Sequence, residues 1–198
     1  MRRFEMIGLA GAWLLWPCVG HTQACSEPHY RWSEKIETSL ATLVAQPVTI
    51  ANVLASWTPR ILTSKDKCAP RAGREDSVYS VTGWVRRIKT LENDGDWHVE
   101  LTAQPTSPVG SCIVVEIPAD SLGAIYAAAR AALDAVPETR HLNANGDLAT
   151  PVELRFTGAA FYDGFHRQTT GAAQGHGRCN SSASALWEIH PVYRVEPP

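Results

Sequence analysis

Three short segments of this chain each place a carboxylate two or three residues before a histidine. They are Asp94-Gly95-Asp96-Trp97-His98, Phe161-Tyr162-Asp163-Gly164-Phe165-His166 and Trp187-Glu188-Ile189-His190. Carboxylates beside imidazoles hold divalent metals, transfer protons as general acids and bases, or satisfy one another in a buried polar network. The residue types therefore indicate where the protein works and leave these three kinds of chemistry open.

Five strand-like segments and one helix are expected to position these residues. Alternating or continuous apolar patterns predict strands over 78–88, 97–103, 112–117, 152–162 and 187–195. Apolar residues at helical spacing predict a helix over 121–136. Three strands, a helix and two strands is the order of an OB-fold, a five-stranded Greek-key barrel. We therefore expect a mainly β protein, with an OB-like barrel over 77–198 and one helix between its strands 3 and 4.

Alternation along these strands predicts which side chains face the barrel core. On the last strand the residues expected inside are Trp187, Ile189, Tyr193 and Val195. The residues expected to face outward are Asp96, His98, Glu100, Glu116, Glu188, His190 and Arg194. In an OB barrel the loops joining strands 1 to 2 and 4 to 5 lie side by side at one rim. The three acid-histidine segments are therefore expected to converge there.

The first third of the mature chain has a different pattern. Apolar spacing predicts a helix over 32–44, with Ser33 as its N-cap and Pro47 after its end, and a second short helix over 49–57. Residues 63–76 are polar and charged, which is typical of a loop. We interpret residues 25–76 as a helical and loop cover on the barrel.

The N-terminus has the order of a secretory signal peptide. Arg2 and Arg3 precede an apolar run over 7–19, which is too short to span a bilayer, and small polar residues follow. We predict a signal peptide over 1–24 and a periplasmic or secreted protein with no transmembrane segment after cleavage. Cleavage after Ala24 makes Cys25 the first mature residue, so a lipoprotein is the alternative.

Four cysteines remain after the signal peptide, and an even number in an exported chain predicts two disulfides. Of the three possible pairings we favour Cys25–Cys68 with Cys112–Cys179, because each closes one half of the chain. The spacing contains no Cys-x-x-Cys pair, which disfavours a cysteine metal site. The formal net charge is −2 and no long basic run occurs, so nucleic acid is not an expected partner.

Together the three segments resemble those of an uncharacterised family of secreted bacterial proteins, whose members share stretches like Asp94–His98, Phe161–His166 and Glu188–Val192. The resemblance covers residues 74–195. Members commonly carry a Gly-rich connection ending in Asn-Gly before the last stretch, and this chain departs there with a cysteine-containing segment. No activity is established for that family, so the resemblance marks positions rather than chemistry.

A thinner resemblance is to staphylococcal-nuclease-like OB domains. Asp94-Gly95-Asp96 is similar to their calcium-binding Asp-Gly-Asp segment, and Glu116-Ile117-Pro118 takes the place of a metal-binding Asp near a Pro. The chain departs from the pattern in having no arginine over 111–115 and in having Trp97 after Asp96. The resemblance implies a metal-dependent phosphodiesterase, for which Arg86, Arg155 and Arg167 are the candidate arginines.

Three functions follow from these observations. The first is a binding module for a divalent metal, zinc or calcium, or for a small polar ligand. Its expected metal ligands are His98, His166 and His190, and its expected ligand-binding carboxylates are Asp94, Asp96, Glu116, Asp163 and Glu188. The second is the phosphodiesterase. The third is an envelope interaction module in which the same residues form a purely structural network.

Overall fold

The computed structural model describes residues 25–90, 92–108, 110–167, 176–179 and 183–198. Over these residues the chain is a mixed α/β fold with a six-stranded sheet and three α-helices. The segment predicted as a signal peptide, residues 1–24, lies outside the described part. Within the described part, no helix combines the length and the apolar character that a membrane crossing requires.

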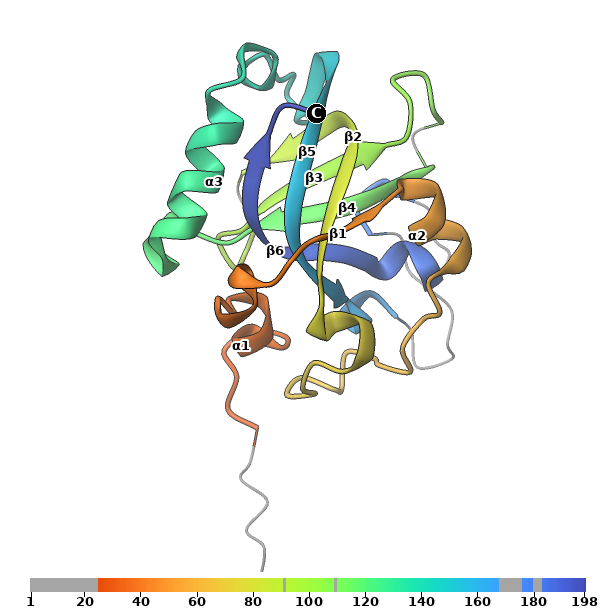
Figure 1. Cartoon of the computed structure of the whole chain (residues 1–198), viewed down its shortest axis with the longest axis vertical. Coiled ribbons are helices and arrows are strands. Elements are labelled where there is room, and N and C mark those ends of the chain that lie inside the picture. Colours follow the sequence, from red (N-terminus) through yellow and green to blue (C-terminus); the bar gives the residue numbers. More distant parts are fainter. Residues whose placement is uncertain (1–24, 91, 109, 168–175, 180–182) are drawn as a thin grey trace, which may run out of the picture.

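Five of the six strands form a ring (Figure 1). They are β2 (Val78–Lys89), β3 (Trp97–Thr102), β4 (Cys112–Ile117), β5 (Asp147–Tyr162) and β6 (Trp187–Glu196). Their order is β2-β3-β4-β6-β5, and β5 pairs again with β2 to close the ring. The β4–β6 pairing is parallel and the others are antiparallel. All five predicted strands are thus confirmed, although β5 begins five residues earlier than expected.

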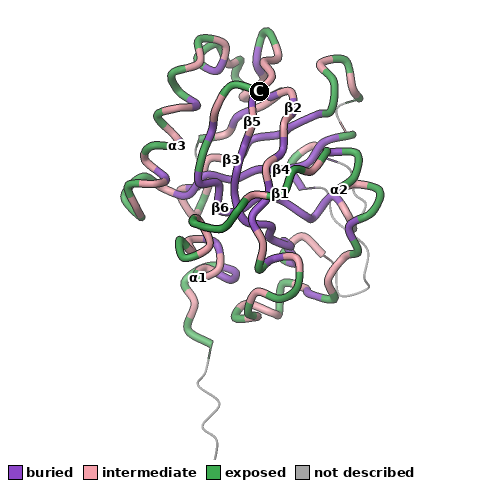
Figure 2. The backbone as a smooth tube through the Cα atoms, in the orientation of Figure 1, coloured by how far each residue is buried: buried purple, intermediate pink, exposed green. Residues whose placement is uncertain are grey.

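The interior of the ring is apolar, and Figure 2 shows that the ring strands are buried along most of their length. Helix α3 (Ala124–Asp134) adds Ala129 and Leu133 to this core. The helix predicted over 121–136 is present, but it begins later, because residues 120–122 form a separate 3-10 turn and Gly123 intervenes.

On β6 the predicted inward set is wrong at one residue. Val192 belongs to the main core, whereas Tyr193 packs in a second cluster with Val78 and Tyr126. The pairing of β5 with β6 shifts register on both sides of Gly158: Tyr193 is an extra residue of β6 on one side, and His190 and Pro191 stand opposite Ala159 alone on the other. Such an irregularity changes the alternation beyond it, which the sequence pattern alone does not reveal.

The N-terminal segment contains α1 (Trp32–Lys35), β1 (Gln46–Val48) and α2 (Ile50–Ser56). The single helix predicted over 32–44 is wrong, because α1 ends after one turn and a 3-10 turn (Ser39–Thr42) follows. Ser33 is not the N-cap; that position is Arg31, in a left-handed conformation with φ 47°. The helix predicted over 49–57 is confirmed as α2, with the Thr49 side chain accepting a hydrogen bond from the Asn52 amide.

The sequence pattern does not predict strand β1, because Pro47 in its centre is typical of a residue that follows the end of a helix. It pairs in parallel with the first part of β2 and lies at the edge of the sheet, where a proline is tolerated.

A buried ion pair attaches the N-terminal segment to the ring. Arg31 and Glu75 are both fully buried and joined by two hydrogen bonds of 2.7 and 2.9 Å. Glu75 also accepts from the Tyr162 amide, and Arg31 donates to the Tyr162 carbonyl, so the pair spans the end of β5. Arg60 also pairs with Glu75, so it is removal of Glu75 that would leave the buried Arg31 guanidinium without a carboxylate among the described residues.

Both favoured disulfides are confirmed, Cys25–Cys68 within the N-terminal segment and Cys112–Cys179 between β4 and the segment before β6. Disulfides of this kind are consistent with an extracellular or periplasmic protein.

Gly158 provides a test of the packing between β5 and β6. A Cβ at this position would lie 2.3 Å from the Pro191 carbonyl oxygen and 2.7 Å from Ile189 Cγ2. We expect Gly158→Ala to lower the free energy of unfolding by about 1–3 kcal/mol, because backbone must move to relieve the overlap. Gly110→Ala is the matched control, since nothing lies within 4 Å of its Cβ position. Equal urea midpoints for the two variants would contradict this packing.

Candidate functional site

The three acid-histidine segments converge on one side of the ring. The polar residues gathered there alternate with core residues of β3, β4 and β6, as predicted, but they are not exposed. Each of these residues is at most 6 % exposed: Asp96, His98, Glu100, Glu116, Asp163, His176, Glu188 and His190. They are buried because the N-terminal segment, through Lys35, and residues 176–178 contact this face of the ring.

Glu116 on β4 is the residue on which three cationic groups meet. Its Oε1 lies 2.9 Å from His98 Nδ1, and its Oε2 lies 3.0 Å from His190 Nδ1 and 3.8 Å from Lys35 Nζ. Burial alone would raise the pKa of Glu116, but Lys35 and the two histidines outweigh burial and hold it well below its ordinary value. Glu116 is therefore an anion, and Lys35, His98 and His190 surround it.

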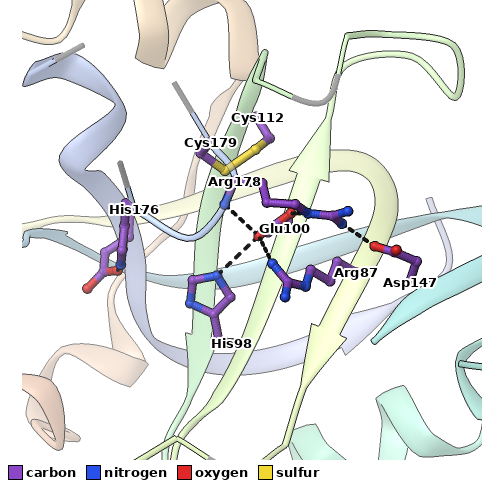
Figure 3. Close-up of a disulfide and its surroundings, with 9 residues drawn as sticks. Arg87, His98, Glu100, Cys112, Asp147, His176, Arg178 and Cys179 are labelled. Carbon is purple, nitrogen blue, oxygen red and sulfur yellow. Dashed lines mark hydrogen bonds and ion pairs between the residues drawn. A yellow bond between two sulfur atoms is a disulfide. The ribbon is translucent and has the colours of Figure 1, made fainter. Parts of the chain in front are cut away.

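Glu100 on β3 organises a second group, which Figure 3 shows beside the disulfide. Its carboxylate accepts a 2.9 Å hydrogen bond from the Arg178 amide and further bonds from the Arg178 and Arg87 side chains. Residue 178 is adjacent to Cys179, which is bonded to Cys112. Glu100 and the disulfide together fix residues 176–179 against β3 and β4.

Gly177 is tightly enclosed in this arrangement. Its φ is +61°, and a Cβ there would lie 2.6 Å from Glu100 Oε1 and 2.7 Å from His98 Nε2. Only glycine suits a positive φ with so little space, and its presence lets His176 approach His98, with ring centroids 5.4 Å apart.

His176 is the central residue that sequence analysis missed. Its Nε2 lies 3.6 Å from Asp163 Oδ2 and 3.5 Å from Glu188 Oε2, and its ring lies 4.6 Å from the His166 ring. It lies in a Gly-rich segment without periodicity, so no pattern predicted where it would lie. Its position three residues before Cys179 was the one available signal.

Among the described residues, three groups of side chains have donor atoms close enough to hold a metal ion. The groups are His98 with Glu116 and His176, Asp163 with His166 and His176, and Asp96 with Glu116 and His190. Each of the three histidines predicted as ligands falls in a different group, so the described residues do not form the predicted site of His98, His166 and His190 together. Glu188 lies beside His176 and His190, and Asp94 pairs with Lys35 at 3.1 Å.

The first two groups border a cavity of about 530 Å³, and they share His176. Tyr30, Lys35, Asp94 and Phe165 also line it. Of the third group only Glu116 lines the cavity, and His190 and Asp96 are completely inaccessible. A ligand entering from solvent can therefore reach the first two groups only.

The histidines of this face differ in charge. Burial lowers the pKa of His176 to about 3, which leaves its imidazole neutral at neutral pH. Burial also opposes charge on His98, but the carboxylates of Glu100 and Glu116 outweigh it and raise the pKa to about 9. For His190 the contacts with Asp96, Glu116 and Glu188 likewise overcome burial and raise the pKa well above its ordinary value.

The pKa of Glu188 is shifted in the opposite direction to that of Glu116. Burial, followed by the negative charge of Glu116, raises the pKa of Glu188 to about 8. Its Oε2 is buried and has no hydrogen-bond partner among the described residues. A cation placed near this oxygen would stabilise the ionised form.

Compared with known proteins, the chain matches no family model and none of the curated proteins. The resemblances to the secreted bacterial family and to the nuclease-like domains stay predictions, and the site must be interpreted from its own geometry.

The contrast between His98 and His176 gives a pH prediction for the metal-free protein. The pKa of His98 is raised from 6.5 to about 9, so its stabilising charge is fully present below pH 6.5 and is lost as the pH rises through 9. The destabilisation caused by His98→Gln should therefore be largest near pH 6, at most about 3 kcal/mol, and should shrink above pH 9. Urea unfolding in the presence of a chelator measures this difference.

His176 should behave in the opposite sense. Its folded pKa of about 3 lies below 6.5, so its contribution is fully present above pH 6.5 and is lost as the pH falls toward 3. His176→Gln should accordingly reduce the acid sensitivity of the fold. A common pH dependence for the two variants would show that the charge states of the two rings are assigned incorrectly.

Proposed function

We propose that the protein is an exported divalent-metal-binding module, whose ion is held by Asp163, His166 and His176 at the wall of the cavity. The buried His/Asp/Glu groups can hold a metal, and this group combines accessibility with a neutral histidine. Asp163 and His166 belong to the segment that leaves β5, and His176 is supplied by the segment tied to β4 by the disulfide.

The spacing of the three donor atoms carries the proposal. Asp163 Oδ2 lies 3.6 Å from His166 Nε2 and 3.6 Å from His176 Nε2. These separations are too long for hydrogen bonds. They are close to the spacing of about 3.3 Å between two ligands of one tetrahedral ion with bonds of about 2.0–2.1 Å. The donors face one another as ligands do around an ion.

Two neighbouring groups support an ion at this position. Glu188 Oε2, buried and unpaired, lies 3.5 Å from His176 Nε2 and is available as a fourth donor. On the other side of His176, the His98 ring packs against it with ring centroids 5.4 Å apart and is itself held by a hydrogen bond to Glu116. Neighbours of this kind fix the orientation of a ligating ring.

The donor set favours zinc over calcium. Two imidazole nitrogens with carboxylate oxygens suit zinc and similar transition metals, whereas calcium takes six to eight oxygen ligands. Because one wall of the group opens to the cavity, a coordination position would remain for water or for a ligand.

As part of the same proposal, the ring of strands is an OB-like barrel with an N-terminal cover over residues 25–76. The strand order β2-β3-β4-β6-β5, the parallel β4–β6 closure and the helix between the third and fourth ring strands support it. The two disulfides support export to the periplasm or beyond the cell.

The phosphodiesterase alternative receives less support. Arg86 donates to backbone carbonyls of the 105–107 turn, and Arg155 contacts Thr82 and Glu196. Neither these two nor Arg167 are among the described residues that line the cavity. The structural-network alternative fits the closed group around His190, where an imidazolium contacts three carboxylates, and we assign that group a structural role.

Zinc should raise the melting temperature of chelator-treated wild-type protein by several degrees, because an ion that binds only the folded state stabilises it by mass action. His176→Ala should abolish the rise, since His176 belongs to both groups at the cavity. His141→Ala is the matched control, because His141 is exposed and lies in none of the three groups.

The comparison with calcium completes this test. We expect calcium at the same concentration to leave the melting temperature unchanged. If zinc has no effect on the wild-type protein, or if its effect survives in His176→Ala, the proposed ion site is wrong and the structural network is the better explanation.

A further inference from the structure

We infer that the cavity beside the ion receives an oxyanion, a phosphate or carboxylate group of the ligand, held between the metal, the Tyr30 hydroxyl and the Lys35 ammonium. This inference rests on the proposed function and names the class of ligand that its open coordination position takes.

Tyr30 supplies the first observation. Only 8 % of the residue is exposed, it lines the cavity, and its hydroxyl is buried with no hydrogen-bond partner among the described residues. The hydroxyl lies beside the residue that follows Asp163, since a Cβ on Gly164 would be 2.5 Å from Tyr30 Oη. A buried phenol without a partner is costly. A ligand oxygen in the cavity would satisfy it.

Lys35 supplies the second observation. It is 7 % exposed, lines the same cavity and, among the described residues, its ammonium forms one hydrogen bond, of 3.1 Å, to Asp94. Its distance of 3.8 Å from Glu116 Oε2 is beyond hydrogen-bond range. An ammonium has three donors, so Lys35 retains hydrogens that an acceptor in the cavity can use.

The charges around the cavity explain why the ligand should be an anion and why it needs the ion. The charged lining residues are the cations Lys35, Lys67 and Lys89 and the anions Glu92, Asp94, Glu116 and Asp163. His98 also lines the cavity and its raised pKa makes it a fourth cation, so four positive and four negative charges give a formal total of zero. A divalent ion changes this total to +2. The cavity therefore has no net attraction for an anion when empty and attracts one after metal binding.

The open coordination position of the ion also favours an anion. A divalent ion on a cavity wall is the strongest local charge, and a negatively charged oxygen is its favoured additional ligand. A phosphate or carboxylate oxygen on the ion would leave further oxygens as acceptors for Tyr30 and Lys35. Ligands without an acid group would satisfy neither donor as well.

The test uses full-length mature protein loaded with one equivalent of cobalt(II), whose visible d–d spectrum reports on its ligands. Inorganic phosphate and acetate are titrated separately, and binding of each is also measured with metal-free protein. We expect at least one anion to change the cobalt spectrum saturably and to bind metal-free protein at least tenfold more weakly. A response to phosphate alone assigns a phosphoryl ligand, and a response to acetate alone assigns a carboxylate.

Variants then assign the donors. Tyr30→Phe keeps the ring and should weaken anion binding about tenfold or more, the effect of losing a hydrogen bond to a charged group, with cobalt affinity unchanged. Lys35→Met should weaken it further. Lys65→Met, at an exposed lysine that does not line the cavity, should have no effect.

The outcomes separate the two proposals. If cobalt binds but neither anion alters its spectrum, or if Tyr30→Phe binds the anion as tightly as wild type, the oxyanion inference is overturned and the metal site stands. Equal anion affinity with and without metal also overturns it. If cobalt does not bind, the proposed function fails and this inference fails with it.

Discussion

The arrangement of this face depends on compensating one buried anion, the Glu116 carboxylate. Its counter-charges come from three distant parts of the chain: Lys35 from the N-terminal segment, His98 from β3 and His190 from β6. A buried carboxylate is tolerated only when it is paired and hydrogen-bonded. The polar site is therefore complete only when the N-terminal segment packs on the ring, because Lys35 and Arg31 both lie on that segment.

The carboxylates of this face give the histidines different charges. His98 and His190 each have a carboxylate oxygen within 3.1 Å of a ring nitrogen, and their raised pKa makes them cations that neutralise these acids. The carboxylate oxygens of Glu188 and Asp163 lie 3.5 and 3.6 Å from His176 Nε2, and burial lowers the pKa of this ring. Ligation requires a neutral imidazole. Identical side chains thus differ in charge according to how closely acids approach them.

Much of this could be predicted from local pattern, because strand alternation and apolar runs depend on residues near in sequence. The five ring strands and the meeting of the Asp94–His98 and Glu188–Val192 segments followed from pattern and topology. His176 did not, since its place depends on a disulfide and on contacts with Glu100 formed only in the folded state. Strand β1 was missed because a sheet edge tolerates Pro47, and Tyr193 was misplaced because register shifts leave no sequence signal.

Residues 176–179 lie outside helices and strands, and three constraints hold them in place. The disulfide to Cys112 fixes their end, Glu100 binds the Arg178 amide, and the close contacts of Gly177 exclude a side chain. A ligand placed within fractions of an ångström depends on such support. Because one of these constraints is a disulfide, the geometry around His176 is complete only where cysteines are oxidised. The compartment indicated by the cysteines and the proposed metal site are thus linked by the same covalent bond.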